Sequence, residues 1–333
     1  MSSECKMSSE SSNGRQIKVK CHERPITDLK FNKDGDLIFT SSKDSTCNVL
    51  YTDGTPLGSF SGHDGSIFSF SLSDNSQFLL TGSADQSVVQ WDIEKGLKIN
   101  QEQIKSVIKA TDNFKNENLF IIGCDGSMGK DKCILLYDCR SKESNKLISL
   151  DTNPTGILID YSQNNVLISN DDGSICQLDL RNNLIINKAQ VHTSKITKIK
   201  PSACRTFLVS SSIDSQAKIV DMANLNTIKT FVCEEPINCS VIFGTNDKII
   251  CVGGINARDV TQSKGKNKFD TKFFDVVTTE QIGFYTTHYG TINCVDVNTD
   301  GTMYCSGGET GLLSVVNFGE DFYNSGFTNF NKF

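Results

Sequence analysis

A pair of residues suited to the end of a β-strand recurs at a nearly constant distance along the chain. The pair is an apolar residue followed, in most copies, by Asp. It occurs at Leu50-Tyr51, Trp91-Asp92, Tyr137-Asp138, Leu178-Asp179, Val220-Asp221, Phe274-Asp275 and Val316-Asn317. Successive copies are 41, 46, 41, 42, 54 and 42 residues apart. A base period of 41–42 residues is typical of a four-stranded propeller blade, so seven copies predict an all-β, seven-bladed propeller.

A second periodic signal involves three of the four histidines. Each of the three lies 22 residues before an Asp. The pairs are His22 with Asp44, His63 with Asp85, and His192 with Asp214. His288 begins a fourth copy, but Thr310 stands where the Asp is expected. The stretch from His63 to Asp92 resembles one complete WD-repeat blade, and two registers that agree along the chain strengthen the propeller prediction.

Ser, His and Asp together also suggest a nucleophilic triad, which an enzyme needs once, in a cleft. Here the His–Asp spacing is repeated in step with the blades, which favours a structural interpretation. In WD-repeat blades these groups form a hydrogen-bonded staple with a strand Ser or Thr and a Trp, and buried polar groups need such partners. Only the second blade has all the parts: His63, Thr81 or Ser83, Asp85 and Trp91.

The two long intervals contain Gly-rich insertions, which we interpret as extended hairpin turns. GCDGSMGKDK (residues 123–132) is similar to a phosphate-binding loop, but Cys124 replaces the first Gly and Asp131 follows Lys130 where Ser or Thr is needed. RDVTQSKGKNKFD (residues 258–270) carries a basic patch of Lys264, Lys266 and Lys268. Contact of this patch with RNA and a simple solvated turn both remain open, and the second is favoured.

A propeller must close, because an open blade leaves unpaired strand edges. The last predicted strand, LLSVVNF, would be the third of its blade, and QIKVK (residues 16–20) could supply the missing fourth strand. We therefore predict one propeller over residues 16–318, a disordered Ser-rich tail over residues 1–15 and a C-terminal tail over residues 319–333.

Composition narrows the class of protein further. The net charge of −6 does not favour binding to a phosphate backbone, and no apolar stretch approaches the ~18 residues of a membrane helix. The 13 cysteines are scattered without a Cys-x-x-Cys motif, which indicates free thiols in a reducing compartment. No local four-ligand zinc set can be named. We expect no metal, no cofactor and no enzyme activity, since a propeller hydrolase would need one non-repeating polar cluster at its channel and none stands out.

Three segments resemble a known family. These segments are similar to the i subunit of eukaryotic translation initiation factor 3. They are the segment that begins at His22-Glu23-Arg24, the segment TGSADQSVVQWD (residues 81–92), and Ala257-Arg258-Asp259-Val260-Thr261 followed by the Lys268-Phe269 and Phe273-Phe274 hairpin. The resemblance extends over the whole predicted propeller, although blades three to five match loosely.

The resemblance implies a non-catalytic, cytoplasmic scaffold subunit. Members bind a helical segment of the b subunit, chiefly through blades five and six, and a short segment of the g subunit. They support recruitment of messenger RNA and initiator tRNA to the small ribosomal subunit, without direct sequence-specific binding of nucleic acid and without a membrane. The alternative is another WD-repeat adaptor in signalling or RNA-processing complexes.

Five residues fall on the partner-binding region that the resemblance implies: Ile219, Asp221, Ile255, Arg258 and Asp259. A helix bound in a groove would use an apolar anchor and a carboxylate that pairs with a basic side chain. For Asp221 the simpler alternative stays equally open, since it also repeats the terminal Asp of each blade.

Overall fold

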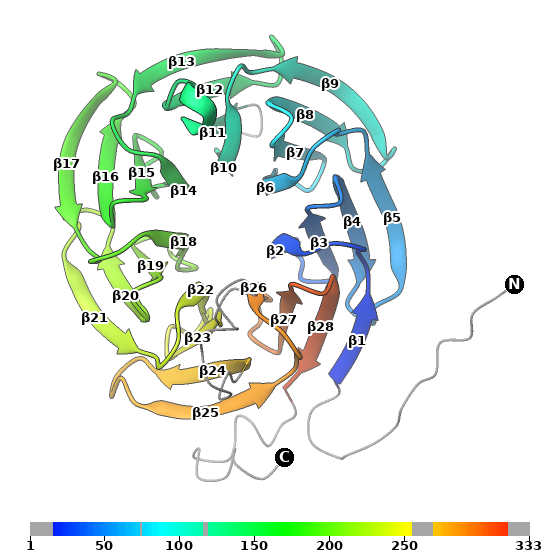
Figure 1. The fold of residues 1–333 in the computed structure, drawn as a ribbon, viewed down its shortest axis with the longest axis vertical. Coiled ribbons are helices and arrows are strands. Elements are labelled where there is room, and N and C mark those ends of the chain that lie inside the picture. The colour runs from blue at the N-terminus through cyan, green and yellow to red at the C-terminus, as the bar shows by residue number, and fades with distance from the viewer. Residues whose placement is uncertain (1–15, 74, 116–118, 255–268, 319–333) are drawn as a thin grey trace, which may run out of the picture.

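The computed structural model describes residues 16–73, 75–115, 119–254 and 269–318. In this part of the chain seven four-stranded antiparallel sheets are arranged around a central axis (Figure 1). The predicted all-β, seven-bladed propeller is therefore confirmed. No helix among the described residues is long and apolar enough to cross a membrane.

Each blade is built from four strands that succeed one another outward from the axis. The innermost strands are β2 (Ile26–Phe31), β6 (Ile67–Leu72), β10 (Val107–Asn113), β14 (Pro154–Ile159), β18 (Ile196–Pro201), β22 (Ile237–Ile242) and β26 (Ile292–Val297). The second strands are β3 (Leu37–Ser42), β7 (Phe78–Ser83), β11 (Leu119–Asp125), β15 (Asn165–Asn170), β19 (Phe207–Ser212), β23 (Lys248–Gly253) and β27 (Met303–Gly308).

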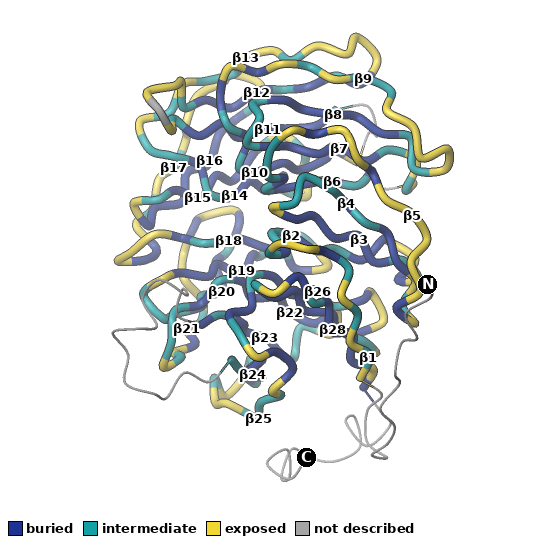
Figure 2. Tube along the Cα trace, turned by 45° about the vertical axis from the view of Figure 1, so that its right-hand side comes forward, coloured by how far each residue is buried: buried dark blue, intermediate teal, exposed yellow. Residues whose placement is uncertain are grey.

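The third strands all end at the predicted periodic pairs. They are β4 (Thr46–Tyr51), β8 (Ser87–Asp92), β12 (Cys133–Asp138), β16 (Ser174–Asp179), β20 (Gln216–Asp221), β24 (Asp270–Asp275) and β28 (Leu312–Asn317). The outermost strands are β5 (Pro56–Ser61), β9 (Leu97–Gln103), β13 (Glu143–Ser149), β17 (Leu184–Gln190), β21 (Thr227–Val232), β25 (Gln281–Thr286) and β1 (Gln16–Lys20). These outermost strands are largely exposed, whereas the strands inside them are largely buried (Figure 2).

The two predicted insertions lie between the second and third strands of their blades. In blade three the Gly-rich segment joins β11 to β12 through the 3₁₀ turn η1 (Ser127–Gly129), so the prediction of a turn between two strands is confirmed. In blade six the insertion lies between β23 and β24, and residues 255–268 are outside the described residues, the three lysines of the basic patch among them.

The ring is closed by the two ends of the described chain. Strand β1 pairs antiparallel with β28, from Gln16 opposite Val316 to Lys20 opposite Leu312. At the end of this pairing the backbone N–H of His22 donates to the carbonyl of Gly311 over 3.2 Å. Gly311 has φ +76°, and a Cβ there would lie 2.1 Å from the His22 carbonyl oxygen, so the approach needs glycine. The predicted closure of the last blade by the N-terminal strand is confirmed.

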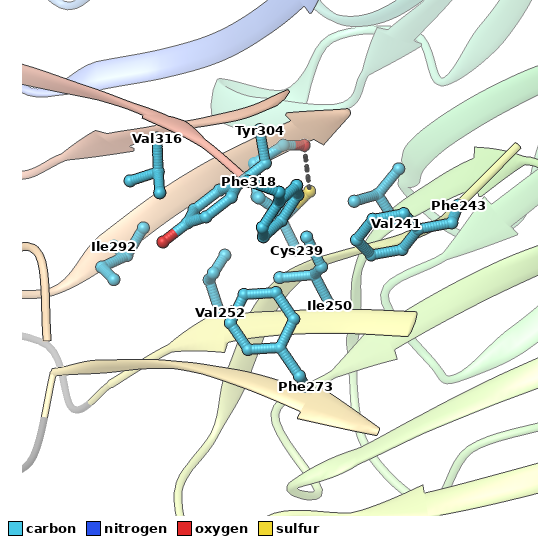
Figure 3. Close-up of a cluster of buried hydrophobic side chains, with 11 residues drawn as sticks. Cys239, Val241, Phe243, Ile250, Val252, Phe273, Ile292, Tyr304, Val316 and Phe318 are labelled. Atoms are coloured by element: carbon cyan, nitrogen blue, oxygen red, sulfur yellow. Dashed lines mark hydrogen bonds between the residues drawn. The ribbon is translucent and has the colours of Figure 1, made fainter. Parts of the chain in front are cut away.

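Seven apolar clusters hold the blades together, one at each junction between neighbouring blades. Figure 3 shows the junction of blades six and seven, where the rings of Phe273, Tyr304 and Phe318 meet at centroid distances of 5.4–6.0 Å. Burying one such side chain contributes about 1.5–3 kcal/mol, so each junction contributes substantially to folding. The twelve cysteines of the described residues are free, and most are buried in these layers.

The three predicted His–Asp pairs lie at the turns between blades. The Nδ1 atoms of His22, His63 and His192 are 2.9, 2.9 and 3.0 Å from a carboxylate oxygen of Asp44, Asp85 and Asp214. Each Nε2 atom contacts a strand hydroxyl, at Thr40, Thr81 and Ser210. In blade two the indole N–H of Trp91 also donates to the Thr81 hydroxyl over 2.8 Å, and Thr81 rather than Ser83 completes the set.

The fourth histidine lacks half of this arrangement. The Nε2 atom of His288 is 2.9 Å from the Ser306 hydroxyl, but its buried Nδ1 atom has no hydrogen-bond partner among the described residues. The turn at Thr310 is followed by Gly311 with φ +76°, which matches the φ of +69° and +64° after Asp44 and Asp214. The backbone is therefore shaped for the missing carboxylate.

We predict that Thr310→Asp stabilises the protein, because the new carboxylate would accept the hydrogen bond that His288 Nδ1 lacks. Because a buried hydrogen bond to a charged group stabilises the folded state, we expect the free energy of unfolding to increase by about 1–2 kcal/mol. Urea unfolding at neutral pH measures this change. Thr310→Asn has nearly the same shape without the charge and should give a smaller gain. A loss of stability in Thr310→Asp would contradict the interpretation of this turn.

The state of His288 also predicts a dependence of stability on pH. Burial and, to a smaller extent, the nearby Lys18 ammonium lower the pKa of His288 to about 4, against the opposing effect of the contact with Ser306. The folded state therefore binds this proton more weakly than the unfolded chain, whose histidine titrates near ~6.5. The contribution of His288 is complete above that pH and is lost as the pH falls towards 4, by about 3 kcal/mol. Urea unfolding across this range should show a shallower loss for His288→Gln than for the wild type, and equal slopes would contradict the prediction.

Candidate functional site

The central channel is shaped by a bulge that is repeated in every blade. In each pairing of the first and second strands the register shifts at one residue of the innermost strand. The bulged residues are Thr27, Phe68, Lys109, Thr155, Thr197, Asn238 and Asn293. Bulges redirect the side chains that follow them. The innermost strands and the turns after them line a cavity of about 680 Å³ on the axis.

Charged side chains from opposite sides of the ring meet in this channel. Lys198 of blade five forms an ion pair with Asp28 of blade one, and its Nζ atom donates to the carbonyl of Thr27 over 2.9 Å. The Nζ atom of Lys200 lies 2.9 Å from Oδ1 of Asp296 in blade seven. Strand β18 is thus tied across the axis to β2 and β26.

A third connection leaves the turn that follows β18. A terminal guanidinium nitrogen of Arg205 lies 3.6 Å from Oδ2 of Asp112 in blade three and donates to the carbonyl of Ile159 in blade four over 3.2 Å. The same oxygen of Asp112 accepts the backbone N–H of Ile159 over 2.9 Å. Blade five therefore reaches blades on both sides of the channel.

The pKa shifts follow from this crowding of charge. Burial alone would raise the pKa of Asp28, but Lys198, Lys30 and Lys200 together hold it below its usual range. Burial alone would lower the pKa of Lys200, and Asp296 outweighs that effect and raises it. These groups therefore remain ionised at neutral pH, and the pairs act as struts across the ring.

This charged cluster corrects one expectation from the sequence. We expected no non-repeating polar cluster at the channel, and the structure contains one. Its members come from strands up to four blades apart along the chain, so no local motif joins them. The available signal was that the charged residues of the cluster occupy two strand positions that other blades fill with Ser, Ala, Gly, Cys, Val or Leu, namely Asp28, Lys30, Asp112, Lys198, Lys200 and Asp296. The three carboxylates are held in ion pairs with Lys198, Lys200 and Arg205.

The residues predicted to contact a partner differ in how far the structure exposes them. The side chain of Ile219 is 3 % exposed and packs in the junction of blades five and six with Val209 and Phe231, so it is not available to a partner. Asp221 lies at the outer end of β20 and is half-buried. Ile255, Arg258 and Asp259 are outside the described residues.

The terminal Asp residues of the blades differ in how their charge is compensated. Asp92, Asp138 and Asp179 pair with Lys95, Arg140 and Arg181 at 3.0–3.2 Å. Asp221 instead accepts the backbone N–H of Ala223 and the side-chain amide of Asn224. Asp275 accepts backbone N–H groups of its own turn. Within the described residues neither Asp221 nor Asp275 has a basic partner, so blades five and six present uncompensated carboxylates.

Exposed apolar side chains accompany these carboxylates. Ile228 lies in β21 where the pairing with β20 shifts register, beside the end of the strand that carries Asp221, and is 54 % exposed. Val232, at the opposite end of the same strand, and Val277, in the turn after Asp275, are 65 % and 74 % exposed. The Nζ atom of Lys229 donates to the carbonyl of Val277 over 3.0 Å and joins the two blades. We call Asp221, Ile228, Val232, Asp275 and Val277 the outer edge of blades five and six.

Comparison with known proteins agrees with this architecture. The family model described as EIF3I matches residues 14–328. The chain is 31% identical to eukaryotic translation initiation factor 3 subunit I of Xenopus tropicalis and 30% identical to that of Danio rerio, over 93% of this chain and 98% of each relative. It is 30% identical to that of Saccharomyces cerevisiae strain S288c, over 93% of this chain and 94% of the relative. The resemblance seen in the sequence is confirmed: the chain belongs to the eukaryotic translation initiation factor 3 subunit I family.

Proposed function

We propose that this chain is a non-catalytic scaffold subunit of the initiation factor 3 complex in the cytoplasm. In this proposal it binds the b and g subunits and thereby supports recruitment of messenger RNA and initiator tRNA to the small ribosomal subunit. Membership of the subunit I family supports the proposal. So does the fold, because a closed ring holds its exposed turns and strand edges on a rigid frame, where binding sites commonly lie.

The observation that carries the proposal is the outer edge of blades five and six. Its two carboxylates lack basic partners among the described residues, and exposed Ile228, Val232 and Val277 lie on the same blades. Apolar anchors beside a carboxylate suit an amphipathic helix that carries a basic residue next to its apolar face. A helical segment of the b subunit is the occupant that we propose for this edge.

Ile219 is no longer part of the proposed contact surface, because its side chain fills the core between the two blades. Ile228 is the better candidate for the apolar anchor, since it is exposed beside the end of β20. For Ile255, Arg258 and Asp259 a partner role stays a proposal that rests on the family resemblance alone.

Affinity purification of the tagged protein from its own cells tests the proposal as a whole. We expect the b and g subunits to be recovered together with proteins of the small ribosomal subunit. Recovery of a signalling or RNA-processing complex without these subunits would support a WD-repeat adaptor instead and would refute the proposal.

Substitutions at the outer edge test the site. We predict that Asp221→Lys weakens binding of the b subunit about tenfold or more, because a lysine would repel the basic residue of the helix. Asp92→Lys is the matched control, since it removes the same turn-capping carboxylate from blade two, where Asp92 accepts the backbone N–H of Lys95. Binding of purified subunit b, measured by surface plasmon resonance, should fall only for Asp221→Lys.

The proposed apolar anchor, Ile228, can be tested with a matched control in another blade. Ile228→Asp should weaken subunit b binding, whereas Leu57→Asp should not, because Leu57 occupies the equivalent register shift in blade one and is 52 % exposed. Circular dichroism confirms that each variant is folded. Undiminished binding by both Asp221→Lys and Ile228→Asp would remove the outer edge from the proposal.

A further inference from the structure

The channel is lined by more basic side chains than acidic ones, so not all of its positive charges are neutralised by ion pairs. Ten charged side chains line the cavity, and seven of them are basic. The basic residues are Lys30, Lys33, Lys109, Lys115, Lys198, Lys200 and Arg205, and the acidic residues are Asp28, Asp112 and Asp296. The lining thus carries an excess of four positive charges in a chain whose net charge is −6. Like charges gathered in a concave site create a strong local potential that attracts anions.

Among the basic residues that form no ion pair with a carboxylate, Lys30 lies deepest in the channel. It is three residues after the bulge in β2, at the strand position that Lys200 and Asp296 occupy in their blades. Its Nζ atom lies 5.6 Å from the centroid of the Phe70 ring, and no carboxylate oxygen of the described residues lies within 4 Å of it. Burial lowers the pKa of Lys30, and Lys200 and Lys198 lower it further against the opposing effect of Asp28 and Asp112. An anion beside this ammonium would offset its cost of burial.

Three more basic side chains line the cavity: Lys33 and Lys115 lie in the turns that follow β2 and β10, and Lys109 lies at the bulge near the start of β10. Lys109 lies over the ring of Phe68 at 3.5 Å from the centroid and is 3.9 Å from Asp125. Lys115 lies over the ring of Tyr161 at 4.5 Å. Lys33 is exposed in the turn after β2. Blades one and three thus supply these side chains, and with Lys198, Lys200 and Arg205 of blade five they lie around the axis.

The shape of the cavity restricts what could bind there. Its volume of about 680 Å³ falls within the range of ~300–1,000 Å³ that is usual for small-molecule sites. Basic groups that surround an axis suit a compact ligand, whereas a single-stranded nucleic acid needs an extended groove with stacking platforms. Six of the seven basic groups are lysines, which bind phosphate as point charges from several directions.

We propose that the central channel binds a compact small molecule that carries several phosphate groups, which enters through the turns that follow the innermost strands. The ligand would lie against Lys30, Lys33 and Lys115. The struts formed by Lys198, Lys200 and Arg205 would stay in place and form the inner wall of the site. The proposal does not depend on the outer edge or on the b subunit.

Isothermal titration calorimetry of the full chain with inositol hexakisphosphate as the probe tests this proposal. We expect binding at one site, with an affinity that decreases as salt is added. Lys30→Gln should weaken binding about tenfold, which corresponds to one charge-assisted hydrogen bond. Lys98→Gln is the matched control, because it removes the same charge from the exposed outer strand β9 of blade two. The Lys98→Gln variant should bind as the wild type does.

A second variant and a second probe complete the test. Lys115→Gln, at an exposed position in the turn after β10, should also weaken binding. Because this position is exposed, the substitution should not disturb folding, and the test remains valid even if Lys30→Gln does not fold. A polyglutamate peptide should not bind comparably, since the proposed ligand is compact. The proposal is overturned if inositol hexakisphosphate does not bind, if Lys98→Gln weakens binding as much as Lys30→Gln, or if polyglutamate binds equally well.

Discussion

The packing of apolar side chains between neighbouring blades is the interaction on which the rest of the structure depends. Each of the seven clusters takes its members from two blades, so no blade has a core of its own. A single twisted four-stranded sheet would leave apolar faces in water, and stacking against two neighbours buries both of them. The channel and the outer edge keep their geometry in the closed ring because every blade is held between two neighbours.

Much of this fold could be predicted from the sequence because its signals are local and periodic. A third strand that ends in an apolar residue and Asp, and a His that lies 22 residues before an Asp, each report on one blade at a time. Closure followed from a strand-like segment at the start and a missing strand at the end. The burial of Ile219 could not be predicted in the same way, because β20 is enclosed on both faces and Ile219 and Val220 are both buried. In such a strand apolar and polar residues do not alternate, so the sequence does not show which side chain faces outward.

The channel struts show where prediction from sequence ends. Lys198 and Asp28 are 170 residues apart, and Lys200 and Asp296 are 96 residues apart, so neither pair belongs to a repeat or a motif. Only the curvature of the ring brings them together. These struts lie on the axis, well apart from the outer edge of blades five and six. A partner bound at the outer edge would therefore leave the channel accessible. An acidic exterior with a basic centre is therefore compatible with two different kinds of ligand on one rigid frame.

The pairing of β1 with β28 also sets the order in which the molecule can be completed. Gln16 and Ser314, whose side chains are hydrogen-bonded, are 298 residues apart. Of the described strands, β1 is synthesised first and can pair with β28 only after nearly all the others have been made. Blades one to six can therefore form while both edges of the ring are still open. Unpaired strand edges and an unfilled junction favour association with other chains. A nascent chain of this protein is consequently most exposed to misassembly just before its final strand emerges.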